Sequence, residues 1–161
     1  MTDPYQALAR RIDAEILDLD RTAAAISRHW QKSEKASTDQ DAYQNSVALN
    51  LHSFYSALER ILELIATELD GGTLGGEAWH SELLRQMTLD LPGTRPPVIE
   101  QNTAMRLDEY RKFRHRIRNI YATNLDATRM KPLVLELPDL WAQVRLELRE
   151  FAHFLDELAE G

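Results

Sequence analysis

The apolar residues of this chain recur three and four positions apart over long stretches, and this spacing constrains the fold more than any other feature. Residues at that spacing share one face of an α-helix, whereas a half-buried strand would alternate apolar and polar residues. No run of the chain alternates in that way, and no period of the length found in repeat proteins recurs. The pattern therefore predicts an all-α protein.

Two long helices are predicted in the first half of the chain. The first begins at Asp3, a good capping residue, and has Pro4 in its first helical position. Its apolar stripe consists of Leu8, Ile12, Ile16, Leu19, Ala23, Ile26 and Trp30. The second helix follows the polar stretch KSEKASTDQD and ends at DGG, where Gly71 can adopt the left-handed conformation that stops a helix. Its stripe consists of Tyr43, Val47, Leu51, Phe54, Leu58, Ile61, Ile65 and Leu69.

Further helices are predicted in the second half. The segment GGEAWHSELLRQMTLDLPG gives a short helix, ended by the Pro-Gly pair at 92–93, whose inward side consists of Trp79, Leu83, Leu84 and Met87. Another helix is expected to begin near 102–103, and its inward residues are Met105, Tyr110, Phe113, Ile117 and Ile120. From Thr128 a short turn or helix is expected to reach Pro138. The stripe of a final amphipathic helix then consists of Leu140, Val144, Leu148, Phe151, Leu155 and Leu158.

These elements predict an up-down bundle of about five helices. The second and the final helix carry apolar residues over more than one stripe, for example Phe54 beside Tyr55 and Phe151 beside Phe154. Such width in a helical bundle favours pairing with a second copy of the chain. A homodimer is therefore expected.

Charge and composition exclude several classes of function. The chain has 161 residues, a formal charge of −7 and no cysteine. A net negative field repels nucleic acids and anionic membranes, so any contact with RNA or DNA has to be local and no membrane partner is expected. Disulfides, thiolate zinc sites and cysteine nucleophiles are excluded. The N-terminus lacks a cationic end followed by an apolar run, and no apolar segment has membrane-spanning length, so we expect an unprocessed cytoplasmic protein.

The histidines are scattered, and none forms a helical pair four residues apart with a nearby carboxylate. We therefore expect neither a metal nor a cofactor. Trp79 and His80 follow a pair of glycines at the start of the short helix. Trp79 is expected to anchor the core, and His80 is expected to be a partly exposed residue at the helix start.

The segment FRHRIRNIYATNLD, residues 113–126, concentrates positive charge in this acidic chain. Its predicted helix carries six cations, opposed locally only by Asp108 and Glu109: Arg106, Arg111, Lys112, Arg114, Arg116 and Arg118. At about 100° per residue, one face of the helix comprises Arg111, Arg114, Arg118 and Tyr121. Guanidinium groups bind phosphate through paired hydrogen bonds and stack on bases, so this face suits a short stretch of RNA. The alternative is a solvated face whose arginines pair with acidic residues of neighbouring helices.

The order of these residues resembles a known motif. Arg114, followed after four residues by Asn119 and after one more by Tyr121, is similar to the Arg-x4-His-x-Tyr motif of HEPN ribonucleases. LHSFYSALERILELIATELDGG, GEAWHSELLRQM, LPGTRPPVI and LDEYRKFRH resemble successive segments of HepT-like toxins, from about Leu49 to the last helix. The resemblance implies a single HEPN/HepT-like helical domain over residues 1–161.

The resemblance also implies a function: the toxin of a HepT/MntA-type toxin-antitoxin system, a homodimer that cuts tRNA or mRNA without a metal. The implied catalytic positions are Arg114, Asn119 and Tyr121, and the implied RNA-binding positions are Arg111, His115 and Arg118. In related systems an MntA-like nucleotidyltransferase antitoxin attaches AMP to the motif tyrosine, here Tyr121, and a bulky anion there would fill the cleft. A Tyr121 ring that packs at the helix end is the alternative.

Position 119 departs from the motif, because Asn119 stands where the family carries histidine. An amide does not exchange a proton near neutral pH, and a general acid-base group typically contributes roughly a hundredfold to ten-thousandfold in rate. Three explanations are open: a weakened natural variant, a deliberately disabled form, or replacement of the missing histidine by His115. The alternative function is a non-catalytic dimeric helical module that binds a nucleotidyltransferase-type antitoxin or RNA.

Overall fold

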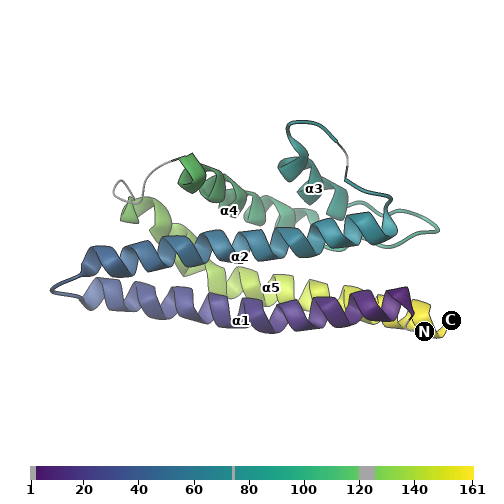
Figure 1. The fold of residues 1–161 in the computed structure, drawn as a ribbon, viewed down its shortest axis with the longest axis horizontal. Helices are drawn as coiled ribbons and strands as arrows, with labels where there is room; N and C mark the ends of the chain where they lie inside the picture. The colour runs from purple at the N-terminus through teal and green to yellow at the C-terminus, as the bar shows by residue number, and fades with distance from the viewer. Residues whose placement is uncertain (1–2, 74, 120–125) are drawn as a thin grey trace.

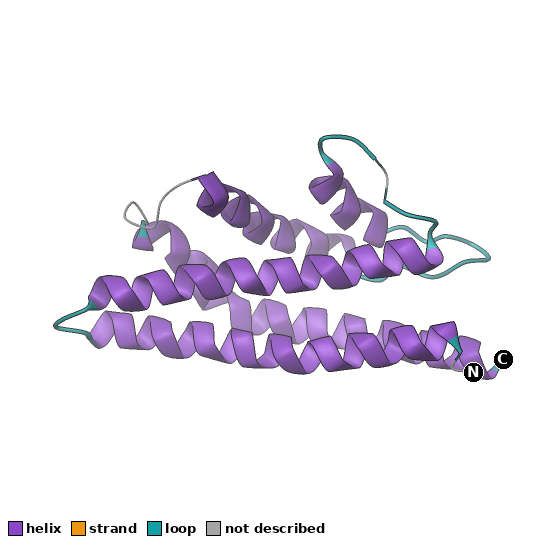
Figure 2. Ribbon diagram, in the orientation of Figure 1, coloured by secondary structure: helices purple, strands orange, loops and turns teal. Residues whose placement is uncertain are grey.

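The structure of the chain is a computed structural model that describes residues 3–73, 75–119 and 126–161. Its helices are α1 (Pro4–Lys35), α2 (Gln40–Leu69), α3 (Trp79–Met87), α4 (Gln101–Asn119) and α5 (Ala127–Glu160). The described ranges contain no strand, only an isolated bridge between Leu91 and Arg95 (Figure 2). The prediction of an all-α bundle is confirmed.

The three long helices form the body of the bundle, and the two shorter ones lie on its α2 side (Figure 1). The turn between α1 and α2 lies at one end of the molecule, and the two termini lie at the other (Figure 1). The end of α4 and the start of α5 lie at the same end as the α1–α2 turn (Figure 1). Short connections thus give neighbouring helices opposite directions, as expected for an up-down bundle.

The predicted boundaries of the long helices rest on caps that the structure shows. The Asp3 carboxylate accepts hydrogen bonds from the backbone N–H groups of Tyr5 (2.8 Å) and Gln6 (3.3 Å), and Pro4 occupies the first position of α1. Gly71 follows α2 with a φ of 81°, in the left-handed region that glycine adopts without strain. Both end signals are therefore confirmed.

The predicted apolar stripes form the core. All seven stripe residues of α1 are buried, as are Val47, Leu51, Phe54, Leu58, Ile61 and Ile65 of α2. Leu83, Leu84 and Met87 of α3 and most of the α5 stripe are buried as well. The helices are therefore held together chiefly by burial of apolar area, the dominant favourable term in folding.

The predicted break before the final helix is wrong. Helix α5 runs from Ala127 to Glu160 without interruption, although Pro132 and Pro138 lie inside it. Each proline removes a backbone donor and costs about 3 kcal/mol in a helix interior. Val134 and Leu137, between the two prolines, are buried, and this packing offsets the cost. The first turns of α5 are inclined to the rest of the helix (Figure 1), as expected at a proline.

Three further expectations about the core are corrected. Met105 was expected to point inward but is 72% exposed, and Leu158 at the end of α5 is also exposed. Phe54, Tyr55 and Phe151 are buried inside one chain, because α2 and α5 are each covered by more than one neighbour. These aromatic residues therefore do not provide a surface for a second copy.

A buried ion pair fixes the loop between α3 and α4. The Arg95 guanidinium donates to both carboxylate oxygens of Asp70, at 2.8 and 2.7 Å, and both side chains are almost fully buried. Arg95 also donates to the backbone carbonyls of Gln86, Leu89 and Pro96. Because every contact converges on one guanidinium, the loop is tied to the end of α2 and to α3.

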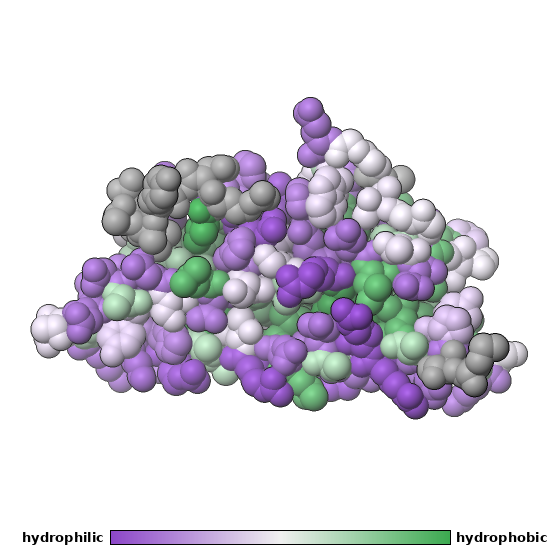
Figure 3. Space-filling view, in the orientation of Figure 1, coloured by the Kyte–Doolittle hydropathy of each residue, from purple (hydrophilic) through white to green (hydrophobic). Residues whose placement is uncertain are grey.

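The surface is mainly hydrophilic on the side that Figure 3 shows, and hydrophobic residues gather along the seam between α1 and α2. Their position agrees with the apolar stripes of these two helices, which meet at that seam. Among the described residues, no helix is long and apolar enough to cross a membrane.

Candidate functional site

Helix α4, which carries the basic segment, is held in place by α5. At its start, the Glu147 carboxylate of α5 accepts hydrogen bonds from the backbone N–H of Glu100 and from the Thr103 hydroxyl (2.7 Å). Further along, the Tyr110 hydroxyl donates to the carbonyl of Leu133 at 2.7 Å. Glu147 thus supplies acceptors to the N-terminus of α4, where backbone donors lack helical partners, and the orientation of α4 is fixed along its length.

Arg114 connects α4 to α2. Its Nε donates to the Ser56 hydroxyl at 2.7 Å, and its Nη1 lies 3.8 Å from Oε1 of Glu59. The Arg114 side chain is 18% exposed. The guanidinium is therefore oriented by α2, while part of the Arg114 side chain remains exposed.

Glu59 connects the same arginine to α3. Its second carboxylate oxygen, Oε2, lies 2.8 Å from Nδ1 of His80, whose ring also stacks on that of Trp79 with centroids 3.7 Å apart. The Glu59 side chain is only 7% exposed, whereas that of His80 is 28% exposed. The buried Glu59 carboxylate thus contacts two partly exposed groups, His80 of α3 and Arg114 of α4. We call these residues the Glu59 cluster: Ser56, Glu59, His80 and Arg114.

The buried Tyr55 hydroxyl lies next to this cluster. Burial raises its pKa well above the ordinary value of 10, and the negative charge of Glu59 raises it further. The positive charges of Arg111 and Arg114 act in the opposite direction but do not compensate. Tyr55 therefore stays protonated at neutral pH and cannot act as a base in this site.

Two other cations of α4 are neutralised by carboxylates. Arg106 pairs with Glu136 (2.9 Å) and Asp139 (2.8 Å) of α5, and hydrogen bonding to Asp139 raises its pKa. Arg111 pairs with Asp108 at 2.6 Å, a contact that likewise raises the pKa of Arg111. For these residues the solvated, ion-paired face was the better interpretation, so the basic field of the segment is weaker than its composition indicates.

The structure describes the predicted site residues to different extents. Arg111 and Arg114 are half-buried on α4, and His115 is exposed on the same helix. The backbones of Arg118 and Asn119 form the last turn of α4. Tyr121 lies outside the described residues, so its predicted catalytic and modification roles have no structural description.

Sequence patterns did not single out Ser56. His80 was predicted only as a partly exposed residue at a helix start, and the structure confirms that position. Glu59 carried a usable signal. It lies four residues after Tyr55 and three before Leu62, in a row of apolar residues on α2, and all three are buried. A charged residue on a buried face needs a partner, but the sequence could not indicate which helix supplies it.

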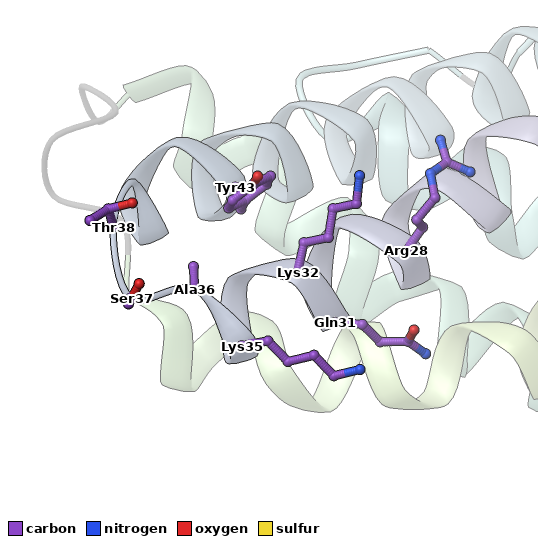
Figure 4. Close-up of a pocket in the computed structure, with 8 residues that line it drawn as sticks. All are labelled: Arg28, Gln31, Lys32, Lys35, Ala36, Ser37, Thr38 and Tyr43. Atoms are coloured by element: carbon purple, nitrogen blue, oxygen red, sulfur yellow. The ribbon is translucent and has the colours of Figure 1, made fainter.

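A second basic site lies at the turn between α1 and α2. A pocket of about 480 Å³ there is lined by the cations Arg28, Lys32 and Lys35 and by Tyr43. Arg28 and Lys32 extend toward α2, whereas Lys35 extends away from it (Figure 4). Lys32 and Lys35 belong to the last turn of α1, where cations stabilise the negative end of the helix dipole. This structural role accounts for the positive charge.

No group of three or more metal-binding side chains occurs in the ranges that the structure describes. The candidate site therefore consists of arginine, histidine, carboxylate and hydroxyl groups. Such groups can bind a phosphate and transfer a proton.

A comparison with protein-family models agrees with the resemblance to HepT-like proteins. A family model described as a HepT-like protein matches residues 46–155, from the early part of α2 to the late part of α5. The matched range includes the whole Glu59 cluster. The comparison with curated proteins and the comparison with solved structures each found no match.

Proposed function

Since the chain belongs to the HepT-like family, we propose that it is the toxin of a toxin-antitoxin pair and a metal-independent endoribonuclease acting on tRNA or mRNA. One observation carries the proposal. Arg114, the arginine that begins the motif, is held by Ser56 and Glu59 with part of its side chain exposed. A guanidinium oriented before substrate arrives can stabilise charge on a phosphate without further reorganisation.

The proposed chemistry uses the ribose 2′-hydroxyl of RNA. A bond forms between the 2′-oxygen and phosphorus, and the bond from phosphorus to the 5′-oxygen breaks. Arg114 stabilises the charge that grows on the phosphate oxygens, and Arg118 is an assisting cation. Arg111 and His115 contact the RNA, and position 119 holds the acid-base group in members that carry histidine there.

In the proposed assembly, the α4 helices of two chains face one cleft. A second copy would double the number of motif arginines around the RNA, which compensates for the net negative charge of each chain. The contacts between the copies would have to be made by residues other than the buried Phe54, Tyr55 and Phe151.

A nucleotidyltransferase of the MntA type is the proposed antitoxin, with Tyr121 as the site of AMP attachment. Each added AMP brings a phosphate, whose negative charge would compete with RNA for the arginines of α4. Mass spectrometry after co-expression with a nucleotidyltransferase would detect the added AMP and assign it to a residue. An unmodified Tyr121 would contradict this part of the proposal.

Asn119 favours a second candidate, a dimeric helical module that binds an antitoxin or RNA without cutting it. The side chain of asparagine offers hydrogen bonds but no exchangeable proton near neutral pH. A chain that depended on position 119 alone for proton transfer would lose its chemistry and keep its binding surface.

The experiment that separates the two candidates compares the native chain with Asn119→His. Both purified proteins are incubated with total RNA in EDTA, which removes contaminating metal-dependent nucleases from consideration. We expect Asn119→His to cut RNA and the native chain to cut it more slowly, because histidine restores a proton-transferring group. Cleavage by neither protein would contradict the nuclease function and favour the binding module.

A further inference from the structure

We propose that His80 is the general base of the native chain and supplies the proton transfer that Asn119 cannot. The inference rests on the proposed nuclease function and names a residue of the same site. It concerns a histidine of α3 that lies outside the Arg-x4-His-x-Tyr pattern, and it removes the need for His115 to replace the motif histidine.

The first argument is the position of His80 relative to Arg114. Glu59 contacts both side chains: Oε2 lies 2.8 Å from Nδ1 of His80, and Oε1 lies 3.8 Å from Nη1 of Arg114. Both flanking side chains are partly exposed, whereas Glu59 is buried. Glu59 therefore links His80 to Arg114, and the proposal places the scissile phosphate at Arg114 with its ribose toward His80.

The second argument is the tautomer that Glu59 imposes. An ionised carboxylate only accepts hydrogen bonds, so Nδ1 of His80 must carry the proton that it donates to Glu59. The neutral ring then presents its other nitrogen, Nε2, as an acceptor. This is the arrangement by which a buried carboxylate orients a catalytic histidine in other enzymes. Stacking on Trp79 further restricts rotation of the ring.

Charged groups of three helices lie around His80. Glu59 faces the ring from α2, and Arg114 of α4 lies beyond Glu59. On α3 itself, Glu82 is paired with Arg85 at 2.9 Å. A general base must be neutral before the reaction.

The proposed step conserves all atoms and protons. Nε2 of His80 takes the proton of the 2′-hydroxyl while the 2′-oxygen bonds to phosphorus. The bond from phosphorus to the 5′-oxygen breaks, and solvent water gives this oxygen a proton. The imidazolium then returns its proton to the resulting hydroxide. The products are a 2′,3′-cyclic phosphate and a 5′-hydroxyl end.

The test measures cleavage of a short fluorescent RNA in EDTA by the native chain and by His80→Asn, each also combined with Asn119→His. Asparagine can still donate to Glu59 but cannot titrate. We expect His80→Asn to lower the native rate by about a hundredfold or more. The double variant with Asn119→His should regain activity. His153→Asn, which removes an exposed histidine paired with Glu157, is the matched control and should cut at the native rate.

A purely structural role of His80 is tested by two further readouts. Urea unfolding should give His80→Asn a midpoint close to that of the native chain. His80→Ala, which vacates the space of the ring, should regain activity when free imidazole is added. Loss of activity without rescue by imidazole, accompanied by a lower unfolding midpoint, would overturn the proposal.

Failure of this inference is distinguishable from failure of the nuclease function. Undiminished cleavage by His80→Asn would overturn the role of His80 and leave the nuclease function intact. Cleavage by Asn119→His but not by the native chain would do the same. Cleavage by neither protein would overturn both.

Discussion

Glu59 is a charged residue on an apolar face of α2, and its burial has to be compensated. Removing an ionised carboxylate from water costs several kcal/mol unless it is paired and hydrogen-bonded. Both partners of Glu59, His80 and Arg114, come from other helices. Compensation of one buried charge therefore also orients the two groups to which the proposed chemistry assigns proton transfer and phosphate binding.

His29 shows a second effect of burial on a single residue. Burial lowers its pKa below the ordinary value of 6.5, and the positive charges of Arg28 and Lys32 lower it further. At a pH between the folded and the unfolded pKa of His29, the unfolded chain binds more protons than the folded chain. The stability that depends on neutral His29 is therefore fully present above about pH 6.5 and is lost as the pH falls through the folded pKa.

We expect the free energy of unfolding, measured in urea between pH 8 and pH 5, to fall less steeply for His29→Asn than for the native chain. Asparagine can keep a hydrogen bond to Ser46, whose hydroxyl lies 2.6 Å from Nδ1 of His29. His153→Asn, an exposed control, should retain the native slope. Equal slopes for the native chain and His29→Asn would show that burial of His29 does not affect stability.

At the residue scale, the sequence was sufficient to predict Arg114 as a site residue and to show that Asn119 departs from the motif. Both follow from the spacing of residues along one helix. It did not allow prediction of the contacts of Ser56, Glu59 and His80. These residues meet Arg114 only through tertiary packing of three helices, and no local pattern encodes which helices are neighbours.

Among the structural elements, the loop between α3 and α4 depends most on polar contacts. The exposed fractions of the Arg95 and Asp70 side chains are 0% and 3%. Arg95 holds the loop that precedes α4 against the end of α2. An ion pair distant from the motif in sequence thus anchors the segment that leads into the motif helix.

We expect Asp70→Asn to lower the free energy of unfolding by roughly 3–5 kcal/mol, because it leaves a buried guanidinium without a counter-charge. Urea unfolding at pH 7 measures the change. Asp18→Asn is the matched control, since the pair between Asp18 and Arg21 is exposed and should contribute about 1 kcal/mol or less. Similar losses in the two variants would contradict the structural role of the buried pair.

Helix stripes and caps were predictable, because they follow from local periodicity and from Asp3, Pro4 and Gly71. The continuity of α5 was not, since prolines ordinarily end helices and only packing on both sides of Pro138 overrides that preference. The exposure of Met105 was missed for a related reason. An apolar residue on a helix can lie at a surface, and the sequence does not show which part of the helix its neighbours cover.

For the whole molecule, the folded core extends beyond the residues that the family model matches. The match begins at residue 46, inside α2, yet α1 contributes a complete buried stripe to the core. Asp20 of α1 also accepts hydrogen bonds from Trp141 and Arg145 of α5. The body that supports the Glu59 cluster therefore includes residues outside the match.

The acidity of the whole molecule also limits how it could hold RNA in the proposed function. Four cations of α4, Arg106, Arg111, Lys112 and Arg114, form ion pairs with carboxylates. Arg116 is exposed. In the proposed function, RNA binding would then depend on a few oriented groups, among them Arg114, and on the proposed second copy of the chain.

The most direct measurement of the proposed function is the initial rate at which the native chain and Arg114→Gln cut a short fluorescent RNA in EDTA. Glutamine keeps a donor for Ser56 but lacks the positive charge. The nuclease function predicts cleavage by the native chain and a loss of about a hundredfold to a thousandfold in Arg114→Gln, with a helical circular dichroism spectrum in both. Equal rates for the two proteins would contradict it, as would the absence of cleavage by both the native chain and Asn119→His.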